Sequence, residues 1–247
     1  MKALKLKKIV AVAVVAIGLA AGAVNVAFSD VLTDPDTEGV QLWKDGPYWA
    51  TCNVGASKPE DYGYYFWWGD ITGYRYLGGK WRDASGAEAA EPFKTDGSKC
   101  PTYNKDVAKL KSEGWCDSAG NLVSSCDAAT AYLGAPWRMP TDAEFNALAS
   151  NCDRSWKDDW NGTGVKGFLF TGKGDYASKS IFLPAAGYGY GSSLINSGSL
   201  GDFWSSTLYS GDSGTAWSLR FLSSYFNVFS NSRCFGRSVR PVRGFAK

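Results

Sequence analysis

The chain has 247 residues, of which 45% are apolar and 15% aromatic, so it can bury a sizeable core. Its net charge is +2, and without four lysines near the N-terminus the balance is −2, so the chain lacks the strong field that attracts nucleic acid or an anionic membrane. The sequence contains no histidine, which excludes His-based triads, His general bases and nearly all catalytic zinc sites.

Residues 1–27 have the three parts of a secretory signal peptide. A lysine-rich start precedes an apolar stretch, Ile9–Ala20, and Ala21-Gly22-Ala23 is an A-x-A cleavage signal. We therefore expect cleavage after Ala23. Cleavage after Ala27, at the end of the 1–27 leader, is a poorer alternative. An uncleaved anchor is the rival interpretation, because about 20 apolar residues can span a bilayer. In either case we expect residues 28–247 to be exported, and either secreted or held at the cell surface.

The cysteine content also fits export. An even number of cysteines in an oxidising compartment predicts disulfides, and six cysteines allow fifteen complete pairings. Turn residues lie between Cys116 and Cys126, so a bond across a hairpin is one candidate. There is no CxxC motif, and we expect neither a metal site nor a cofactor. The six are Cys52, Cys100, Cys116, Cys126, Cys152 and Cys234.

The first half of the exported chain predicts two strands and a long insertion. Between Val40 and Val54, apolar and aromatic residues flank the turn formers Gly46 and Pro47, so we expect two strands that meet there. The next stretch, Thr72–Gly114, is polar and weakly periodic. We expect it to form a long surface insertion.

Two short helices and two strands are expected next. Asp127 can cap a helix that ends at Gly134, and Thr141–Glu144 is a capping box that begins a helix to about Ala149. The strands are expected at Val165–Thr171 and Ser180–Gly187, and Pro184 should end hydrogen bonding in the second.

The C-terminal segment alternates with a period of two at Thr215–Leu222, which is typical of a strand. Trp217, Leu219 and Phe221 would share an inward face, whereas Ser218, Arg220 and Leu222 would face outward. Outward residues elsewhere in this segment include tyrosine and phenylalanine. Because large apolar groups on a surface tend to mark binding sites, this face is predicted to bind a ligand.

The composition of the C-terminal segment is unusual. Lys, Glu, Gln and Met are all absent from Tyr188 to Ala246, although twelve lysines occur from Asp30 to Gly187. The outward residues are Phe, Leu, Tyr, Ser, Arg, Cys, Asp and Asn. Each of these is reachable from an Asn codon by changing adenines alone. The bias therefore indicates diversification at adenines rather than chance.

Five motifs spread over Trp49–Arg243 resemble the Fibrobacter-type major paralogous domain. The resemblance implies an α+β, C-type-lectin-like (formylglycine-generating-enzyme-like) domain of twisted antiparallel strands with two short helices and long loops. It also implies a variable protein of a diversity-generating retroelement, in which an error-prone reverse transcriptase rewrites adenines. The motifs are Trp49–Ala56 with Tyr65–Asp70, Trp137–Glu144, Ser180–Gly187, Trp204-Ser205-Ser206 and Ser238-Val239-Arg240-Pro241-Val242.

We therefore expect residues 28–247 to form one domain with a variable ligand-binding region at about 188–237. Its partner would be a protein or glycan on a cell or phage surface, not nucleic acid, and it would meet a membrane only if the leader is uncleaved. The scaffold aromatics Trp67, Trp68 and Trp204 should lie beneath the surface or away from it. The candidate ligand-binding residues are Tyr188, Tyr190, Phe203, Leu208, Tyr209, Ser210, Ser218, Arg220, Leu222, Tyr225, Phe226, Phe229, Ser230, Ser232, Cys234 and Phe235.

Two alternatives stay open. A conventional glycan lectin would stack sugars on aromatic faces, and a calcium ion could assist it. An oxidase of the formylglycine-generating type would need two reactive cysteines near the C-terminal end, where this sequence has only Cys234. We expect no catalytic residues. The arginines that follow Trp204 suit protein recognition or pairing with acidic groups of the scaffold, and a polyanion site is the minor alternative.

Overall fold

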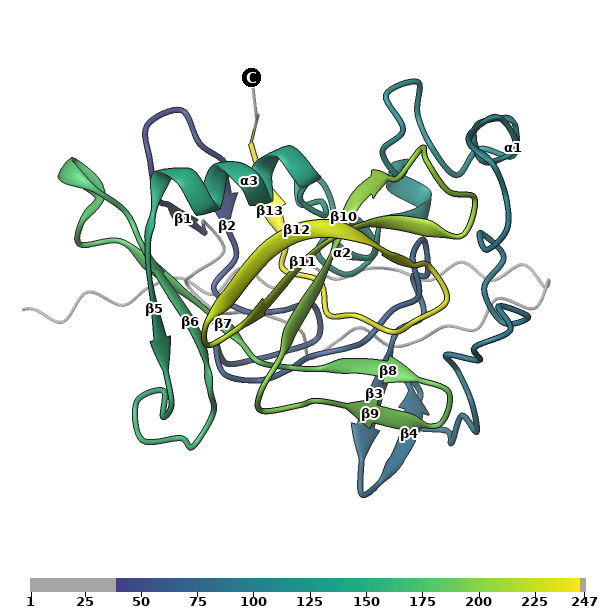
Figure 1. Ribbon diagram of the computed structural model, residues 1–247, viewed down its shortest axis with the longest axis horizontal. Helices are drawn as coiled ribbons and strands as arrows, with labels where there is room; N and C mark the ends of the chain where they lie inside the picture. Colours follow the sequence, from purple (N-terminus) through teal and green to yellow (C-terminus); the bar gives the residue numbers. More distant parts are fainter. Residues whose placement is uncertain (1–38, 245–247) are drawn as a thin grey trace, which may run out of the picture. The chain divides into compact units, whose positions relative to one another are not determined.

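The central element is an antiparallel sheet of three eight-residue strands near the C-terminal end, β10 (Gly201–Leu208), β11 (Thr215–Leu222) and β12 (Tyr225–Ser232). The structure is a computed structural model, and it describes residues 39–244 (Figure 1). The predicted signal peptide lies outside the described residues. Strand β11 is the middle strand, and its predicted bounds at Thr215 and Leu222 are confirmed.

Residues 39–244 form four smaller sheets besides this one, and every strand pair within those sheets is antiparallel. The predicted α+β class is therefore shown at the level of short helices and antiparallel strands. The sheets are β1 (Val40–Gln41), β2 (Tyr48–Trp49) and β13 (Val242–Arg243); β3 (Tyr74–Leu77) and β4 (Lys80–Asp83); β5 (Asp153–Lys157), β6 (Gly167–Thr171) and β7 (Ser180–Pro184); and β8 (Tyr188–Tyr190) with β9 (Ser193–Ile195).

The helices are short. The two expected ones are present as α2 (Ala128–Leu133) and α3 (Asp142–Asn151). Two single 3-10 turns lie at Ser124–Cys126 and Gly174–Tyr176. Within the described residues no helix is long and apolar enough to cross a membrane.

The insertion at residues 72–114 is more ordered than predicted. It contains the β3–β4 hairpin and a further helix, α1 (Val107–Ser112), where the Asp106 side chain accepts a hydrogen bond from the backbone N–H of Lys109. Trp81 and Phe93 from this stretch are buried together, with ring centroids 4.9 Å apart. Two large aromatic rings provide enough apolar area to fix a polar segment against the domain.

Helix α3 packs against all three strands of the central sheet. Phe145 and Leu148, predicted to share a face of this helix, are fully buried with Phe203, Leu219 and Phe221 of the sheet. This face of the sheet is therefore closed by the helix.

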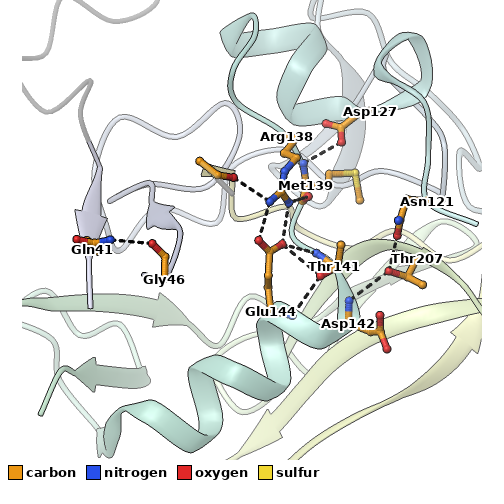
Figure 2. A network of polar contacts seen from close by, with 11 residues as sticks. Gln41, Gly46, Asn121, Asp127, Arg138, Met139, Thr141, Asp142, Glu144 and Thr207 are labelled. Atoms are coloured by element: carbon orange, nitrogen blue, oxygen red, sulfur yellow. Dashed lines mark hydrogen bonds and ion pairs between the residues drawn. The ribbon is translucent and has the colours of Figure 1, made fainter. Parts of the chain in front are cut away.

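The predicted capping box at the start of α3 is confirmed. The Thr141 hydroxyl accepts from the backbone N–H of Glu144, and the Glu144 carboxylate accepts from the N–H of Thr141 (Figure 2). The same carboxylate, which is almost completely buried, takes two hydrogen bonds of 2.6 and 2.7 Å from Arg138. Arg138 also donates to the carbonyl of Gly244, so one polar network fixes the helix start beside the end of the chain.

The stretch that follows β12, residues 233–242, runs through the interior beside residues 50–68. Backbone N–H groups of Ala50, Val54, Phe66 and Trp68 donate in turn to the carbonyls of Pro241, Val239, Arg237 and Arg233. Two of the motifs found in the sequence, one at each end of the domain, are thus partners in space.

Arg240 holds this arrangement at its centre. It is fully buried and donates to the side-chain oxygen of Asn53 at 2.9 Å, to the carbonyl of Ala50 at 3.0 Å and to that of Phe182 in β7 at 2.9 Å. Burial lowers its pKa to about 10. The expected acidic partner is replaced by carbonyl and amide oxygens, which disperse the charge without a second ion.

Replacing Arg240 with methionine should lower the free energy of unfolding by roughly 3 kcal/mol or more, because several buried acceptors lose their donor. Denaturant unfolding measures this value. Arg154→Met, which removes an exposed arginine from β5, is the control and should change it by about 0.5 kcal/mol or less. Equal effects of the two substitutions would contradict the central role of Arg240.

A second prediction concerns Asp70, which is buried and accepts from the backbone N–H of Thr72 at 2.7 Å. Burial raises its pKa to about 6. The folded pKa lies above the unfolded value, so this group contributes stability at low pH that is lost as the pH rises through 6. Between pH 4 and pH 7 the wild type should lose up to about 3 kcal/mol relative to Asp70→Asn. Parallel pH profiles for the two proteins would show that Asp70 is not desolvated.

Candidate ligand-binding surface

The central sheet has two unlike faces. The register places Phe203, Leu219 and Val228 in one row and Phe221 with Phe226 in another, all on the face that α3 covers. We call this the inner face. The outer face carries the alternating residues, which are Asp202, Trp204, Ala216, Ser218, Arg220, Leu222, Tyr225, Asn227, Phe229 and Asn231.

The outer face is covered along β10 and at Ala216 and Ser218 of β11, and it opens toward the end of the β11–β12 hairpin. Asp202 and Trp204 have no exposed area, and the Trp204 indole N–H donates to the carbonyl of Phe66 at 2.8 Å. At the other side Leu222 and Tyr225, which lie opposite each other at the end of the hairpin, are 38% and 41% exposed. The open strip therefore follows the β11–β12 hairpin.

An aromatic group extends this strip. Tyr188 and Tyr190 of β8 meet Phe235, with ring centroids 6.1 Å and 4.9 Å from it, and Tyr190 is 44% exposed. The Arg220 guanidinium lies 5.6 Å from the Tyr188 ring and 4.9 Å from the Phe229 ring, which joins the aromatic group to the hairpin.

Two glycines fix the aromatic group in place. Gly189 and Gly236 exchange backbone hydrogen bonds of 2.7 and 2.9 Å, and the Phe93 ring lies directly over both. A Cβ atom at either position would approach that ring to within about 2.3 Å, closer than carbon atoms can pack. Phe93 of the insertion thus determines where Tyr190 and Phe235 lie.

Three charged groups form the base of the open strip. Asp202 accepts from Arg220 through Nε at 3.1 Å and Nη2 at 2.6 Å. Its other oxygen lies 2.8 Å from Nε of Arg237, in an ion pair whose angle does not suit a hydrogen bond. Arg237 is fully buried, and that burial lowers its pKa although Asp202 opposes the effect.

Seven of the sixteen predicted residues meet on this surface: Tyr188, Tyr190, Arg220, Leu222, Tyr225, Phe229 and Phe235. We call them, together with Asn227, the binding strip. They come from three separate segments, which the fold brings to one side. The scaffold prediction is confirmed for Trp68 and Trp204, which have no exposed area.

Four predicted residues are buried and cannot contact a ligand. Phe203 is on the inner face, because its row contains Leu219 of the core. Leu208 lies opposite Ala216 on the covered part of the outer face, in the buried cluster that contains Trp204. Ser218 is on the outer face but has no exposed area, and its hydroxyl accepts from Asn231 at 2.7 Å. Cys234 is 2% exposed.

The other five predicted residues lie elsewhere. Phe226, Ser230 and Ser232 alternate onto the inner face of β12, where the half-buried Phe226 ring packs on Phe170. Tyr209 and Ser210 follow the end of β10, and the Tyr209 ring contacts Trp217. Trp217, predicted as core, is therefore only half-buried at the rim of the inner face.

Asn227, Asn231 and Asp202 were not among the predicted residues, although they share the outer face with Arg220. Asn227 is exposed and lies opposite Arg220. The side-chain oxygen of Asn231 accepts a hydrogen bond of 3.2 Å from Nη2 of Arg220. The alternation that begins at Tyr225 would have found the two asparagines.

The cysteines near this surface are buried. The Cys100 thiol lies 3.5 Å from the carbonyl of Arg233, the residue before Cys234. Burial raises the pKa of Cys100 to about 11 and also raises that of Cys234, which disfavours the thiolate that an oxidase would need. Cys116 and Cys126 are likewise thiols here, so the predicted disulfide stays a prediction. Between residues 39 and 244 no group of three or more Cys, Asp or Glu is placed to hold a metal ion.

The surface lies in the part of the chain that matches a known family model. Residues 166–242 match a model described as a domain of unknown function (DUF8237). The match extends from just before β6 to the first residue of β13, so it contains the whole binding strip. No curated protein and no solved structure matches the chain significantly.

The assignment of faces is tested by alanine substitution. Trp204→Ala and Phe221→Ala should each lower the free energy of unfolding by roughly 3–5 kcal/mol, because both rings are fully buried. Tyr225→Ala should change it by about 0.5 kcal/mol or less. Thermal or denaturant melts give these values, and a Tyr225 variant as unstable as the Phe221 variant would contradict the assignment.

Proposed function

We propose that this chain is an exported target-binding protein, in which a fixed scaffold of C-type-lectin-like type presents a C-terminal surface that a retroelement diversifies. The observation that carries the proposal is the composition of the binding strip. Exposed Tyr190, Leu222 and Tyr225 surround a half-buried arginine on a sheet whose other face is closed by α3.

The side chains of the strip suit recognition of a macromolecule. Tyrosine and arginine are the residue types that most often dominate binding energy at interfaces, since they combine large contact area with polar groups. Their positions are supported from below by Trp204 and Arg237, which have no exposed area. A supported aromatic surface loses little conformational entropy when a partner binds.

Diversification is supported by the separation between tolerant and intolerant positions. Tyr190, Leu222, Tyr225 and Asn227 are exposed, whereas the motif residues Trp204 and Arg240 are fully buried. All four exposed residues are of types that an Asn codon reaches through its adenines. Substitution at such positions changes the surface without removing core contacts.

A library tests this separation. Random Asn-derived codons at Tyr190, Leu222, Tyr225 and Asn227 should leave most variants folded, as judged by protease resistance of displayed protein. The same codons at Phe203, Trp204 and Phe221 should leave few folded variants, because each change opens a cavity or buries a polar group. Similar folded fractions in both libraries would contradict a designed division between surface and scaffold.

The retroelement itself is tested in the neighbouring DNA. A near-copy of the sequence that encodes residues 188–237, with Asn codons where the strip residues are encoded, should lie beside a reverse transcriptase gene. Sequencing that region in many isolates should show changes confined to adenines of the copy. If the copy is missing, the fixed-sequence lectin becomes the better explanation.

A further inference from the structure

The charged groups beneath the binding strip form a chain of alternating sign. Arg237 and Asp202 are fully buried, and the side chain of Arg220, which pairs with the same carboxylate, is 23% exposed. The order from the interior to the surface is therefore cation, anion, cation. The chain ends at the surface on a positive charge.

The outer end of this chain has one open position. Nε of Arg220 is bonded to Asp202, and Nη2 is shared between Asp202 and Asn231. Nη1 makes no hydrogen bond to any described residue and is not among the buried polar atoms that lack a partner, so it reaches solvent. The two N–H groups of Nη1 therefore have no acceptor among the described residues.

The charge at this point is not compensated. One carboxylate faces two guanidinium groups, and Asp212, the other acidic residue between 188 and 244, instead accepts from the backbone N–H of Gly214 in the turn after β10. An apolar partner that covered Arg220 would remove it from water without replacing the lost hydrogen bonds. A carboxylate would continue the alternation and form a charge-assisted bond to Nη1.

The surroundings favour a peptide over a sugar. Leu222, Tyr225 and Phe229 offer apolar area beside Arg220, on which an aliphatic or aromatic side chain can pack. The Tyr188 and Phe235 rings are stacked, with an angle of 24° between their planes. The ring faces that meet in this stack are therefore turned toward each other and not toward a sugar.

From these contacts we infer that the strip takes an acidic segment of a partner protein. An Asp or Glu carboxylate of that segment accepts from Nη1 of Arg220, and an adjacent apolar side chain packs on Leu222 and Tyr225. The inference rests on the proposed function, because it names the ligand class of the same surface.

The test is a selection followed by affinity measurements. The full chain is panned against a phage-displayed library of random peptides at low salt, and an array of acidic and neutral glycans is probed in parallel. Recovered peptides are synthesised and measured against the wild type, Arg220→Gln and the double variant Leu222→Ala/Tyr225→Ala. Arg154→Gln is the matched control, because it removes an exposed arginine from β5, beside the inner-face residue Phe226. Thermal melts establish that each variant is folded.

The expected peptides carry Asp or Glu beside an apolar residue. Arg220→Gln should weaken their binding about ten- to hundredfold through loss of one charge-assisted hydrogen bond, and Arg154→Gln should leave it unchanged. Added salt should weaken binding to the wild type more than binding to Arg220→Gln.

Three results would overturn the inference. Peptides without acidic residues that still depend on Leu222 and Tyr225 would refute the carboxylate and leave the proposed function standing. If neither Arg220→Gln nor the double variant weakens binding, recognition lies elsewhere on the protein. That result would refute both the acidic-peptide inference and the proposed binding function of the strip. If no peptide is recovered but acidic glycans bind in an Arg220-dependent way, the anionic ligand group is supported and the peptide as its carrier is refuted.

Discussion

The structure depends on a buried C-terminal segment that is held by hydrogen bonds from arginines to backbone carbonyls. Arg240 connects residues near β2 with β7, and Arg233 donates from Nη1 to the carbonyls of Thr102, Lys105 and Ser213. These acceptors come from regions far apart in the sequence. A guanidinium presents five donors in a fixed plane, so one side chain can fix several loops at once. In a domain with few long elements, this substitutes for the regular packing of helices.

This constraint explains why the binding strip sits where it does. The segment that contains Arg233, Arg237 and Arg240 runs beside the edge of β10, where the guanidinium of Arg237 covers the ring of Trp204, so this side of the outer face is buried. Among the described residues of this sheet, only the end of the β11–β12 hairpin remains open on the outer face. The mostly apolar inner face packs against α3, which fixes the sheet on which Arg220 lies.

Much of the local structure could be predicted from the sequence. The capping box at Thr141, the two helices, the bounds of β11 and the outward position of Arg220 and Leu222 follow from patterns within a few residues. Such signals express local chemistry, namely a side-chain acceptor for a helix N–H or the alternation of a strand. They do not require knowledge of the tertiary fold.

The errors arise where distant segments decide burial. Ser218 alternates correctly onto the outer face, but nothing near it in the sequence shows that Asn231 and the neighbouring rows would cover it. Leu208 was misplaced because it packs with Leu122 and Trp204 in a buried cluster on the covered part of the outer face, and Cys234 because the segment that contains Cys100 packs against it. A bias toward certain residue types marks out a segment of the sequence, yet it cannot separate the exposed from the buried members of that segment.

The contact of Phe93 with Gly189 and Gly236 has a consequence for how such a surface changes over time. The aromatic group with Tyr190 and Phe235 is positioned by a residue from the insertion, whereas Arg220 and Leu222 are positioned by the central sheet. The two halves of the surface therefore rest on different supports. Substitutions in the insertion would move one half relative to the other and so change the width of the surface, whereas substitutions in the hairpin would change its chemistry. Shape and composition are in this way open to independent adjustment, on separate stretches of the gene.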